Sequence, residues 1–137
     1  MNTKIKGNDG EDRATSFLIK NGYVIIDRNW RTKYGEIDII AFKNDTIVFI
    51  EVKTLPNGTI DMIQRELNQK KLKRIVETSK RFLLNHRQYS NSYVRYDVIV
   101  IDMPGYPEVY HIENAFNSMI EDIKYIKLST YFKSVKR

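Results

Sequence analysis

Apolar residues recur along this chain at two spacings, that of a helix and that of a strand. Near the start, three apolar residues share one helical face, namely Ala14, Phe17 and Leu18. Either residue of the pair Asn8-Asp9 can cap this helix, acidic residues in its first turn suit the helix dipole, and Gly22 ends it. The pattern therefore predicts a first helix that runs to about Lys20.

Five apolar runs bounded by turn-forming residues predict strands. They cover residues 23–27, 36–42, 47–54, 94–101 and 109–112. The run at 94–101 is apolar at nearly every position, as expected for a strand that is covered on both faces. Pro56-Asn57-Gly58 and Pro104-Gly105 mark loops between elements.

A second helical stripe lies between the third and fourth predicted strands. Its apolar face consists of Leu72, Ile75, Val76, Ser79, Phe82 and Leu83. The stripe predicts one long helix from near Asp61 to about His86, and the amphipathic tail from Glu113 onward predicts a helical C-terminal extension. The order helix, three strands, long helix, two strands predicts a single α/β domain over residues 1–137, with a mixed sheet flanked by helices.

The second and third strands bring charged residues to one place. Asn44-Asp45 is the only turn-like dipeptide between them, so the numbers of paired residues add up to 89. Asp38 then lies opposite Glu51, and Glu36 lies opposite Lys53. Because side chains two residues apart share a face, all four project from one side of the hairpin.

Two facing carboxylates on apolar strands favour a divalent cation between them or a shared proton. A neighbouring lysine suits phosphate chemistry and favours the cation. In a plainer interpretation, Glu36 and Lys53 form a cross-strand ion pair, and Asp38 and Glu51 reach solvent at the strand ends. A one-residue bulge in the turn would break the alignment on which the first interpretation depends.

The net charge of +6 is concentrated between residues 64 and 87, where eight basic residues accompany two acidic ones. The basic residues are Arg65, Lys70, Lys71, Lys73, Arg74, Lys80, Arg81 and Arg87. Such a helix can track the phosphates of a nucleic acid, or it can simply be a solvated face. Lys71 precedes the buried stripe by one turn, so it can reach back over the sheet or extend along the rim.

A basic and aromatic segment is expected as a loop between the first strand and the hairpin. It contains Trp30-Arg31, Lys33 and Tyr34. The loop could contact a nucleic acid beside the acidic residues, although a Trp30 that anchors it in the core is the simpler explanation.

Several classes of protein and site are excluded or disfavoured. The absence of cysteine excludes disulfides and thiolate metal sites, and no apolar run reaches the length of a membrane span. We therefore expect a cytoplasmic protein without a membrane partner. His86 and His111 have no partner at a metal-ligand or catalytic spacing, and Asp97 is interpreted as a structural partner of Arg95 or of another strand.

An ordered series of motifs extends through most of the chain. It comprises Gly10-Glu11, Ala14, Leu18, Gly22-Tyr23, Arg28-Asn29-Trp30-Arg31, Gly35-Glu36-Ile37-Asp38-Ile39-Ile40, Phe49-Ile50-Glu51-Val52-Lys53-Thr54, Lys71, Arg95-Tyr96-Asp97-Val98 and Asn114-Ala115-Phe116. The series resembles the PD-(D/E)XK nuclease superfamily. More narrowly, it resembles the YraN-like family of bacterial endonuclease-like proteins, relatives of the archaeal Holliday junction resolvases.

This resemblance implies a three-layer restriction-endonuclease-like fold and a site for Mg²⁺ or Mn²⁺. It assigns Asp38 and Glu51 as metal ligands, Lys53 as the catalytic lysine and Glu11 as a further catalytic acid. Lys71 receives a supporting role. The chain departs from the family at Leu55, where a basic residue is common, in a loop expected to contact substrate.

Two functions therefore remain open. The first is a metal-dependent endonuclease that hydrolyses phosphodiester bonds of DNA, including branched or structured DNA. The second is a nucleic-acid-binding module with a nuclease-like fold and little activity, acting through a partner. The expected contacts to nucleic acid are Arg31, Lys33, Lys70, Lys71, Lys73 and Arg74. DNA is favoured over RNA as the partner, and a homodimer is left open beside a monomer.

Overall fold

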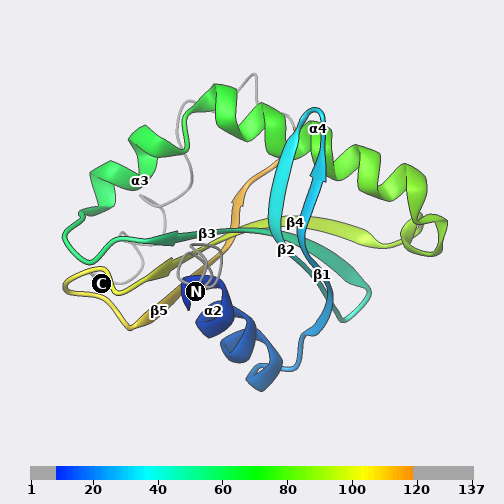
Figure 1. Cartoon of the computed structure of the whole chain (residues 1–137). Helices are drawn as coiled ribbons and strands as arrows, with labels where there is room; N and C mark the ends of the chain where they lie inside the picture. The colour runs from blue at the N-terminus through cyan, green and yellow to red at the C-terminus, as the bar shows by residue number, and fades with distance from the viewer. Residues whose placement is uncertain (1–8, 119–137) are drawn as a thin grey trace, which may run out of the picture.

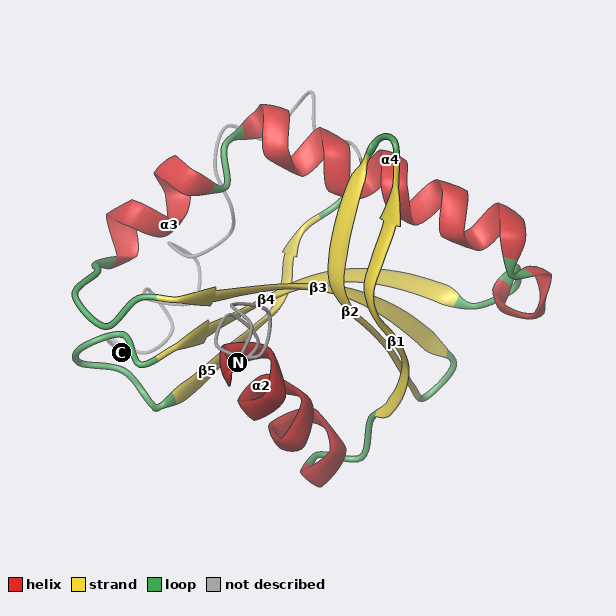
Figure 2. Cartoon of the chain, viewed as in Figure 1, coloured by secondary structure: helices red, strands yellow, loops and turns green. Residues whose placement is uncertain are grey.

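Five strands with helices on both sides form an α/β fold in the computed structural model, which describes residues 9–118 (Figures 1 and 2). The elements are α2 (Asp9–Lys20), β1 (Val24–Thr32), β2 (Gly35–Lys43), β3 (Thr46–Thr54), α3 (Ile60–Glu66), α4 (Gln69–Asn85), the short 3-10 helix η1 (Arg87–Tyr89), β4 (Tyr93–Ile101) and β5 (Val109–Phe116). This arrangement confirms the predicted mixed sheet and agrees with a three-layer nuclease-like fold.

The strands lie in the sheet in the order in which they occur in the chain. All neighbours are antiparallel except β3 and β4, which are parallel and are connected through α3 and α4. Helix α2 covers one face, and α3 and α4 lie over the other (Figure 2). An apolar core fills each interface, so the central strands are buried on both faces, as the run at 94–101 indicated. Within residues 9–118, no helix has the length and apolar character needed to cross a membrane.

The tight turn between β2 and β3 sets their register. Asn44 and Asp45 both have positive φ, 50° and 59°, as a two-residue turn of this kind requires. The pairs run from Lys43–Thr46 to Ile39–Ile50, and the numbers in each pair add up to 89. The predicted register is therefore confirmed over this part of the hairpin.

Beyond Ile39 and Ile50, β2 and β3 separate. The start of β2 stays paired with β1, while β3 continues beside β4 to its end. In Figure 1 the β1–β2 pair rises away from β3 toward α4. Ile37 and Ile39 consequently lie in cores on opposite sides of the sheet, although they are only two residues apart. The alternation predicted for this stretch therefore fails for the apolar pair Ile37 and Ile39.

Strand β1 is longer than predicted, which corrects the expected loop. Trp30 and Arg31 are strand residues, and only Lys33 and Tyr34 form the connection to β2. The Trp30 ring packs edge-on against Phe82 of α4, with 5.2 Å between ring centroids. Trp30 thus anchors the β1–β2 pair in the core, which was the simpler of the two explanations.

The predicted long helix is two helices, α3 and α4, separated by Leu67 and Asn68. The apolar pattern continues across the break because Leu67 is buried in the same core as Leu72. Asn68 starts α4, since its side chain accepts a hydrogen bond from the backbone N–H of Lys71 at 3.1 Å. Asn68 is therefore the local signal for the start of a new helix, and the continuous apolar periodicity hid this signal.

The ends of two further elements test the remaining predictions. Gly22 has φ of 89° and ends α2, as predicted. Glu113 and the residues up to Phe116 belong to β5, so the expected helical extension does not begin at 113. Its remaining part, from residue 119 onward, lies outside the described residues.

Candidate active site

An open pocket of about 640 Å³ lies where β2 and β3 separate. The β1–β2 connection forms one wall and the first half of α4 forms another. The lining residues are Thr32, Lys33, Tyr34, Gly35, Glu36, Asp38, Glu51, Val52, Lys53, Lys71, Arg74 and Ile75. The pocket therefore contains three of the four predicted catalytic residues, Asp38, Glu51 and Lys53.

Asp38 lies where β2 and β3 separate, and its side chain makes a hydrogen bond to β3 where the backbone hydrogen bonds between the two strands have ended. Its Oδ2 accepts a hydrogen bond from the backbone N–H of Val52 at 2.8 Å. The backbone ladder has ended one residue earlier, at Ile39 and Ile50. The carboxylate is thus held in a fixed position between the two strands, with Glu51 beside it on β3.

The pKa of Asp38 is raised to about 7. Burial of the carboxyl group is the largest cause, and the negative charge of Glu51 is the next. The Val52 N–H opposes the shift, while a hydrogen bond with Glu51 and the charge of Glu36 add to it. Negative charge is therefore concentrated around Asp38, and this favours a bound proton or a cation beside its carboxyl group.

Two lysines flank Glu51, whose side chain is only 6% exposed. The Nζ atoms of Lys71 and Lys53 lie 3.6 Å and 3.8 Å from its Oε2. Lys53 also lies 3.9 Å from Oε1 of Glu66 in α3. Lys71 thus reaches back over the sheet, which decides between the two orientations that the sequence allowed.

Glu36 does not pair with Lys53, contrary to the simple hairpin register. Its Oε2 lies 2.7 Å from Nε of Arg31 on the neighbouring strand β1. The reason is that β2 remains with β1 after leaving β3, so Arg31 is directly opposite Glu36. Arg31 therefore neutralises an acidic residue of the pocket.

Glu11 approaches the same point from α2. One carboxylate oxygen from each of Glu11, Glu36 and Asp38 lies within 4.8 Å of the others. Glu11 accepts a hydrogen bond from Asn29 at 2.9 Å, and Arg28 lies 3.5 Å from the same oxygen. Burial and the charge of Asp38 nevertheless raise the pKa of Glu11. The fold thus brings together acidic residues from α2, β2 and β3, an oxygen donor set of the type that Mg²⁺ and Mn²⁺ prefer.

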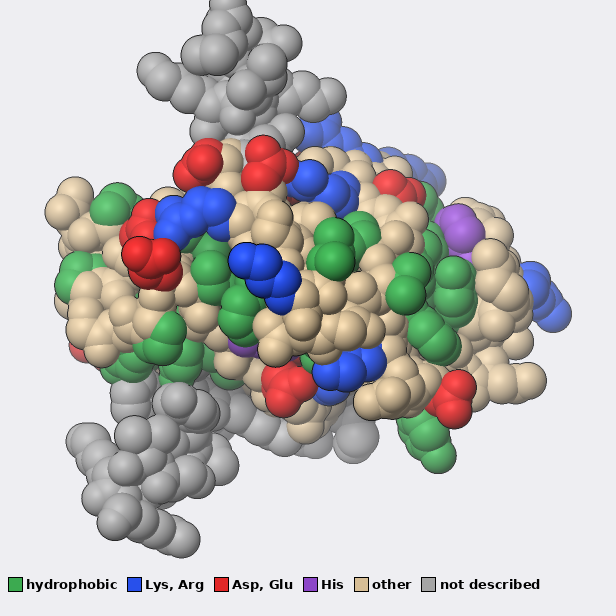
Figure 3. Space-filling model, turned by 90° about the horizontal axis from the view of Figure 1, so that it is seen from below, with side chains coloured by type: hydrophobic (Ala, Val, Ile, Leu, Met, Phe, Trp, Pro, Cys, Tyr) green, Lys and Arg blue, Asp and Glu red, His purple; other side chains and the backbone are tan. Residues whose placement is uncertain are grey.

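The predicted nucleic-acid contacts divide into two groups. Lys33, Lys71 and Arg74 line the pocket. Lys70 and Lys73, exposed on α4, and Arg31, which pairs with Glu36, lie outside its lining. On the α2 side of the molecule, acidic and basic side chains are interspersed (Figure 3). The basic residues that line the pocket come from three elements: Lys33 from the β1–β2 connection, Lys53 from β3, and Lys71 and Arg74 from α4.

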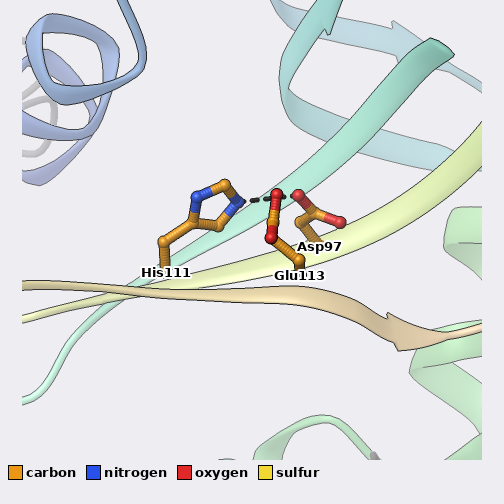
Figure 4. Close-up of side chains that lie close together, drawn as sticks. All are labelled: Asp97, His111 and Glu113. Atoms are coloured by element: carbon orange, nitrogen blue, oxygen red, sulfur yellow. Dashed lines mark hydrogen bonds and ion pairs between the residues drawn. The ribbon is translucent and has the colours of Figure 1, made fainter. Parts of the chain in front are cut away.

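A second polar cluster lies on the α2 side of β4 and β5, where Asp97, His111 and Glu113 come together (Figure 4). Asp97 is fully buried and accepts hydrogen bonds from Nε and Nη2 of Arg95, both at 2.9 Å. The Asn114 N–H donates to it at 2.9 Å, and Nε2 of His111 lies 2.7 Å away. These partners lower the pKa of Asp97 against the effect of its burial.

This second cluster is structural. Both oxygens of Asp97 are engaged, and Nη2 of Arg95 also lies 3.1 Å from Glu113, so a guanidinium occupies the space that a cation would need. Asp97 is a structural partner of Arg95, as predicted, whereas the expectation that His111 has no partner at a metal-ligand or catalytic spacing is corrected, because His111 lies beside Asp97 and Glu113. His111 and Asp97 lie on adjacent antiparallel strands, and only the β4–β5 register could have revealed their contact.

His86 also has partners, although none of them is catalytic. Its Nδ1 lies 2.8 Å from the carbonyl oxygen of Phe82, and its ring stacks on the Phe82 ring with centroids 3.8 Å apart. The ring therefore closes the end of α4 over the core and lies outside the lining of the acidic pocket.

The fold and the site define an α/β protein with a carboxylate- and lysine-lined pocket at a split in its sheet. The family model described as "Uncharacterised protein family UPF0102" matches residues 10–101, and the chain belongs to this family. A UPF0102 protein from Treponema denticola is 40% identical over 121 residues, which cover 80% of this chain and 93% of the relative. A UPF0102 protein from Alkaliphilus oremlandii is 43% identical over 118 residues, which cover 85% of this chain and 100% of the relative. The expected YraN-like family membership is thus confirmed.

Asp38, which is partly buried, and Asp97, which is fully buried, predict opposite responses to neutralisation. Without metal at pH 8, Asp38→Asn should raise the free energy of unfolding by at least about 1 kcal/mol, because each unit of raised pKa corresponds to about 1.4 kcal/mol. The folded carboxyl group retains its proton to about pH 7 and the unfolded one only to about 3.8, so stability is lost as the pH rises through this window. Thermal melts at pH 4 and pH 8 should show a gain only at the higher pH.

Asp97→Asn is the matched control, because its pKa is shifted downward. At pH 8 this variant should lose about 3 kcal/mol, since an amide cannot satisfy both Arg95 and His111. The stability that Asp97 contributes is present above pH 3.8 and is lost as the pH falls through its lowered pKa. If both variants changed stability in the same direction at pH 8, the assigned electrostatics of the acidic pocket would be wrong.

Proposed function

We propose that this protein is a metal-dependent endonuclease that hydrolyses phosphodiester bonds of DNA, including branched or structured DNA. The observation that supports this proposal most strongly is the meeting of Asp38, Glu51 and Lys53 at one split in the sheet. The three residues come from β2 and β3, which pair only between the Asn44-Asp45 turn and the pair Ile39–Ile50. Their order and spacing resemble the metal-binding core of the PD-(D/E)XK nuclease superfamily.

The donor set fits the cation that the resemblance implies. Asp38 and Glu51 would hold Mg²⁺ or Mn²⁺, with Glu11 and Glu36 as further carboxylates close to Asp38. All of these donors are oxygen atoms, and their mutual repulsion would be relieved by positive charge. When bound, such an ion supplies Lewis acidity to a phosphate group and to the attacking water.

The lysines of the pocket supply positive charge at the reacting phosphate. Lys53 and Lys71 lie on two sides of Glu51 and approach it from different elements, β3 and α4. Lys53 would orient the attacking water or neutralise charge that develops on the phosphate. Lys71 would help to hold the phosphate against the carboxylates.

The surface around the pocket suits a polyanion. Arg74 of α4 and Lys33 of the β1–β2 connection both line the pocket, and exposed lysines continue along α4 beyond the lining. Contacts from such residues to phosphates supply affinity without reading sequence. The same surface supports binding to a nucleic acid whether or not hydrolysis follows.

One observation favours the alternative function, a nucleic-acid-binding module with little activity that acts through a partner. Lys53 and Lys71 pair with Glu51, and Asp38 accepts a hydrogen bond from Val52, so these groups satisfy one another without an ion. An endonuclease should lose DNA cleavage when metal or Lys53 is removed, whereas a binding module should bind DNA without cleaving it.

Metal binding should be visible as a gain in stability. We expect millimolar Mn²⁺ or Mg²⁺ to raise the melting temperature of the wild type. At a metal concentration one hundred times the dissociation constant, the free energy of unfolding should rise by about 2.7 kcal/mol. Asp38→Asn should abolish the gain. Asp45→Asn, which changes an exposed aspartate in the β2–β3 turn, should retain it. A wild-type melting temperature that does not change with metal would contradict the site.

Nucleic-acid binding should depend on the basic residues of α4. We expect Lys73→Ala and Arg74→Ala together to weaken DNA binding and to reduce the slope of log affinity against log salt by about 2, since each lost phosphate contact removes about 0.9. Lys20→Ala with Arg87→Ala removes the same charge from exposed positions outside the pocket lining and is the matched control. Equal salt slopes for both double variants would mean that this part of α4 is only a solvated face.

Catalysis itself should depend on Lys53. We expect Lys53→Ala to reduce cleavage of DNA by about 10²–10³ while DNA affinity and the Mn²⁺-induced gain in stability remain, because the lysine acts on charge that develops in the transition state. Lys53→Arg should restore the rate only in part, since a planar guanidinium replaces a compact ammonium. Linear, single-stranded and four-way-junction DNA serve as substrates, with EDTA as the control.

The cleavage assay also separates the two functions. Wild-type DNA binding without cleavage of any substrate would favour the binding module. Cleavage by Lys53→Ala at the wild-type rate would identify Lys53 as a structural partner of Glu51 and Glu66 and would refute the catalytic assignment.

A further inference from the structure

The connection between β1 and β2 holds an aromatic ring at the rim of the acidic pocket. Tyr34 is 37% exposed and lines the pocket together with its neighbour Lys33. The turn around it is ordered by a hydrogen bond from the Tyr34 N–H to Oγ1 of Thr32 at 3.0 Å. The ring is therefore presented at the pocket by a structured turn.

Close packing against α4 fixes the position of this turn. A Cβ atom on Gly35 would lie 3.1 Å from Oγ1 of Thr78 and 3.7 Å from the Cβ of Arg74, so the backbone of Gly35 nearly touches the helix. Trp30 anchors the same pair of strands by packing on Phe82. Because the turn is held at both points, the position of Tyr34 relative to the carboxylates of the pocket is fixed.

Two cations accompany the Tyr34 ring. Nη2 of Arg81 donates a hydrogen bond to the Tyr34 hydroxyl at 3.0 Å, and the guanidinium carbon lies 4.6 Å from the ring centroid. Nζ of Lys33 lies 5.4 Å from the same centroid. Both cations lie over the ring, so a base would stack on Tyr34 in place of the exposed Lys33 side chain. The displaced lysine and Arg81 would then be positioned to bind the phosphate of the same nucleotide.

We propose that Tyr34, with Lys33 and Arg81, forms a binding site for an unpaired nucleotide next to the phosphate held in the acidic pocket. In a continuous duplex each base is already stacked on both faces and paired at its edge. Only a base at a flap, an overhang, a bulge or an open branch point is free to stack on Tyr34. The site thus selects nucleic acid with unpaired bases over plain duplex. This inference rests on the proposed function and narrows its substrate class.

The test compares two DNA ligands in EDTA, so that no cleavage occurs. One is a blunt duplex, and the other is the same duplex with a short 3′ single-stranded overhang that carries 2-aminopurine. We expect the wild type to bind the overhang ligand about tenfold more tightly than the blunt one, in the range that stacking of one base on an aromatic side chain gives. The 2-aminopurine fluorescence should fall on binding, because the base stacks.

Three variants identify the stacking ring. Tyr34→Ala should bring the affinity ratio close to one and remove the fluorescence decrease. Tyr34→Phe should keep both, since it loses the hydroxyl contact with Arg81 but retains the ring. Tyr93→Ala removes a tyrosine that is 76% exposed at the start of β4, outside the pocket lining, and should behave as the wild type. Thermal melts confirm that each variant is folded.

The possible failures are distinguishable. If the wild type binds neither ligand, the proposed function fails and the nucleotide site fails with it. If the wild type binds both ligands with equal affinity, or if Tyr34→Ala keeps the tenfold preference and the fluorescence decrease, the nucleotide site alone is refuted. In that case the α4 and Lys53 variants still test the proposed endonuclease.

Discussion

The hydrogen bond from the Val52 N–H to the Asp38 carboxylate is the contact on which the arrangement of the site depends. It stands at the point where β2 leaves β3, and it connects the two strands where the backbone ladder no longer does. The separation creates the pocket, and the same side chain that bridges it is one of the pocket's acidic groups. Asp38 therefore has two roles, because it connects the two strands and is also a candidate functional group of the pocket. The fold holds its carboxylate in place before any ligand binds.

Asp38 and Asp97, two aspartates of the same sheet, show how the surroundings of identical side chains give them different roles. Asp97 has a guanidinium, an imidazole and a backbone N–H around it, and these donors lower its pKa. Asp38 has one backbone donor and is surrounded by other carboxylates, so burial and repulsion raise its pKa. A satisfied ion pair serves packing, whereas a carboxyl group whose pKa is raised by burial and by neighbouring carboxylates in an open pocket is characteristic of functional sites. This contrast separates the candidate active site from the polar cluster on the α2 side of the sheet.

Much of the sheet followed from local signals that do not depend on distant contacts. The Asn44-Asp45 turn fixed the hairpin register, and Gly22 marked the end of α2. Other features were hidden because a continuous apolar pattern does not show where the chain breaks or bends. Leu67 is buried in the same core as the helices on either side of it, so α3 and α4 looked like one helix. Trp30 looked like a loop residue because its partner, Phe82, is far away in the sequence.

The sequence by itself determined the α/β class and the proximity of Asp38 to Glu51, because turn chemistry and strand periodicity are local properties. Only the tertiary structure decided that β2 would leave β3 at Asp38, that Glu36 would pair with Arg31, and that Lys71 would reach Glu51. It also brought Glu11 from α2 to the same point and placed Tyr34 against Arg81. These contacts join elements that are far apart in the chain. Their geometry is set by the packing of helices on a twisted sheet, and no pattern within one segment encodes it.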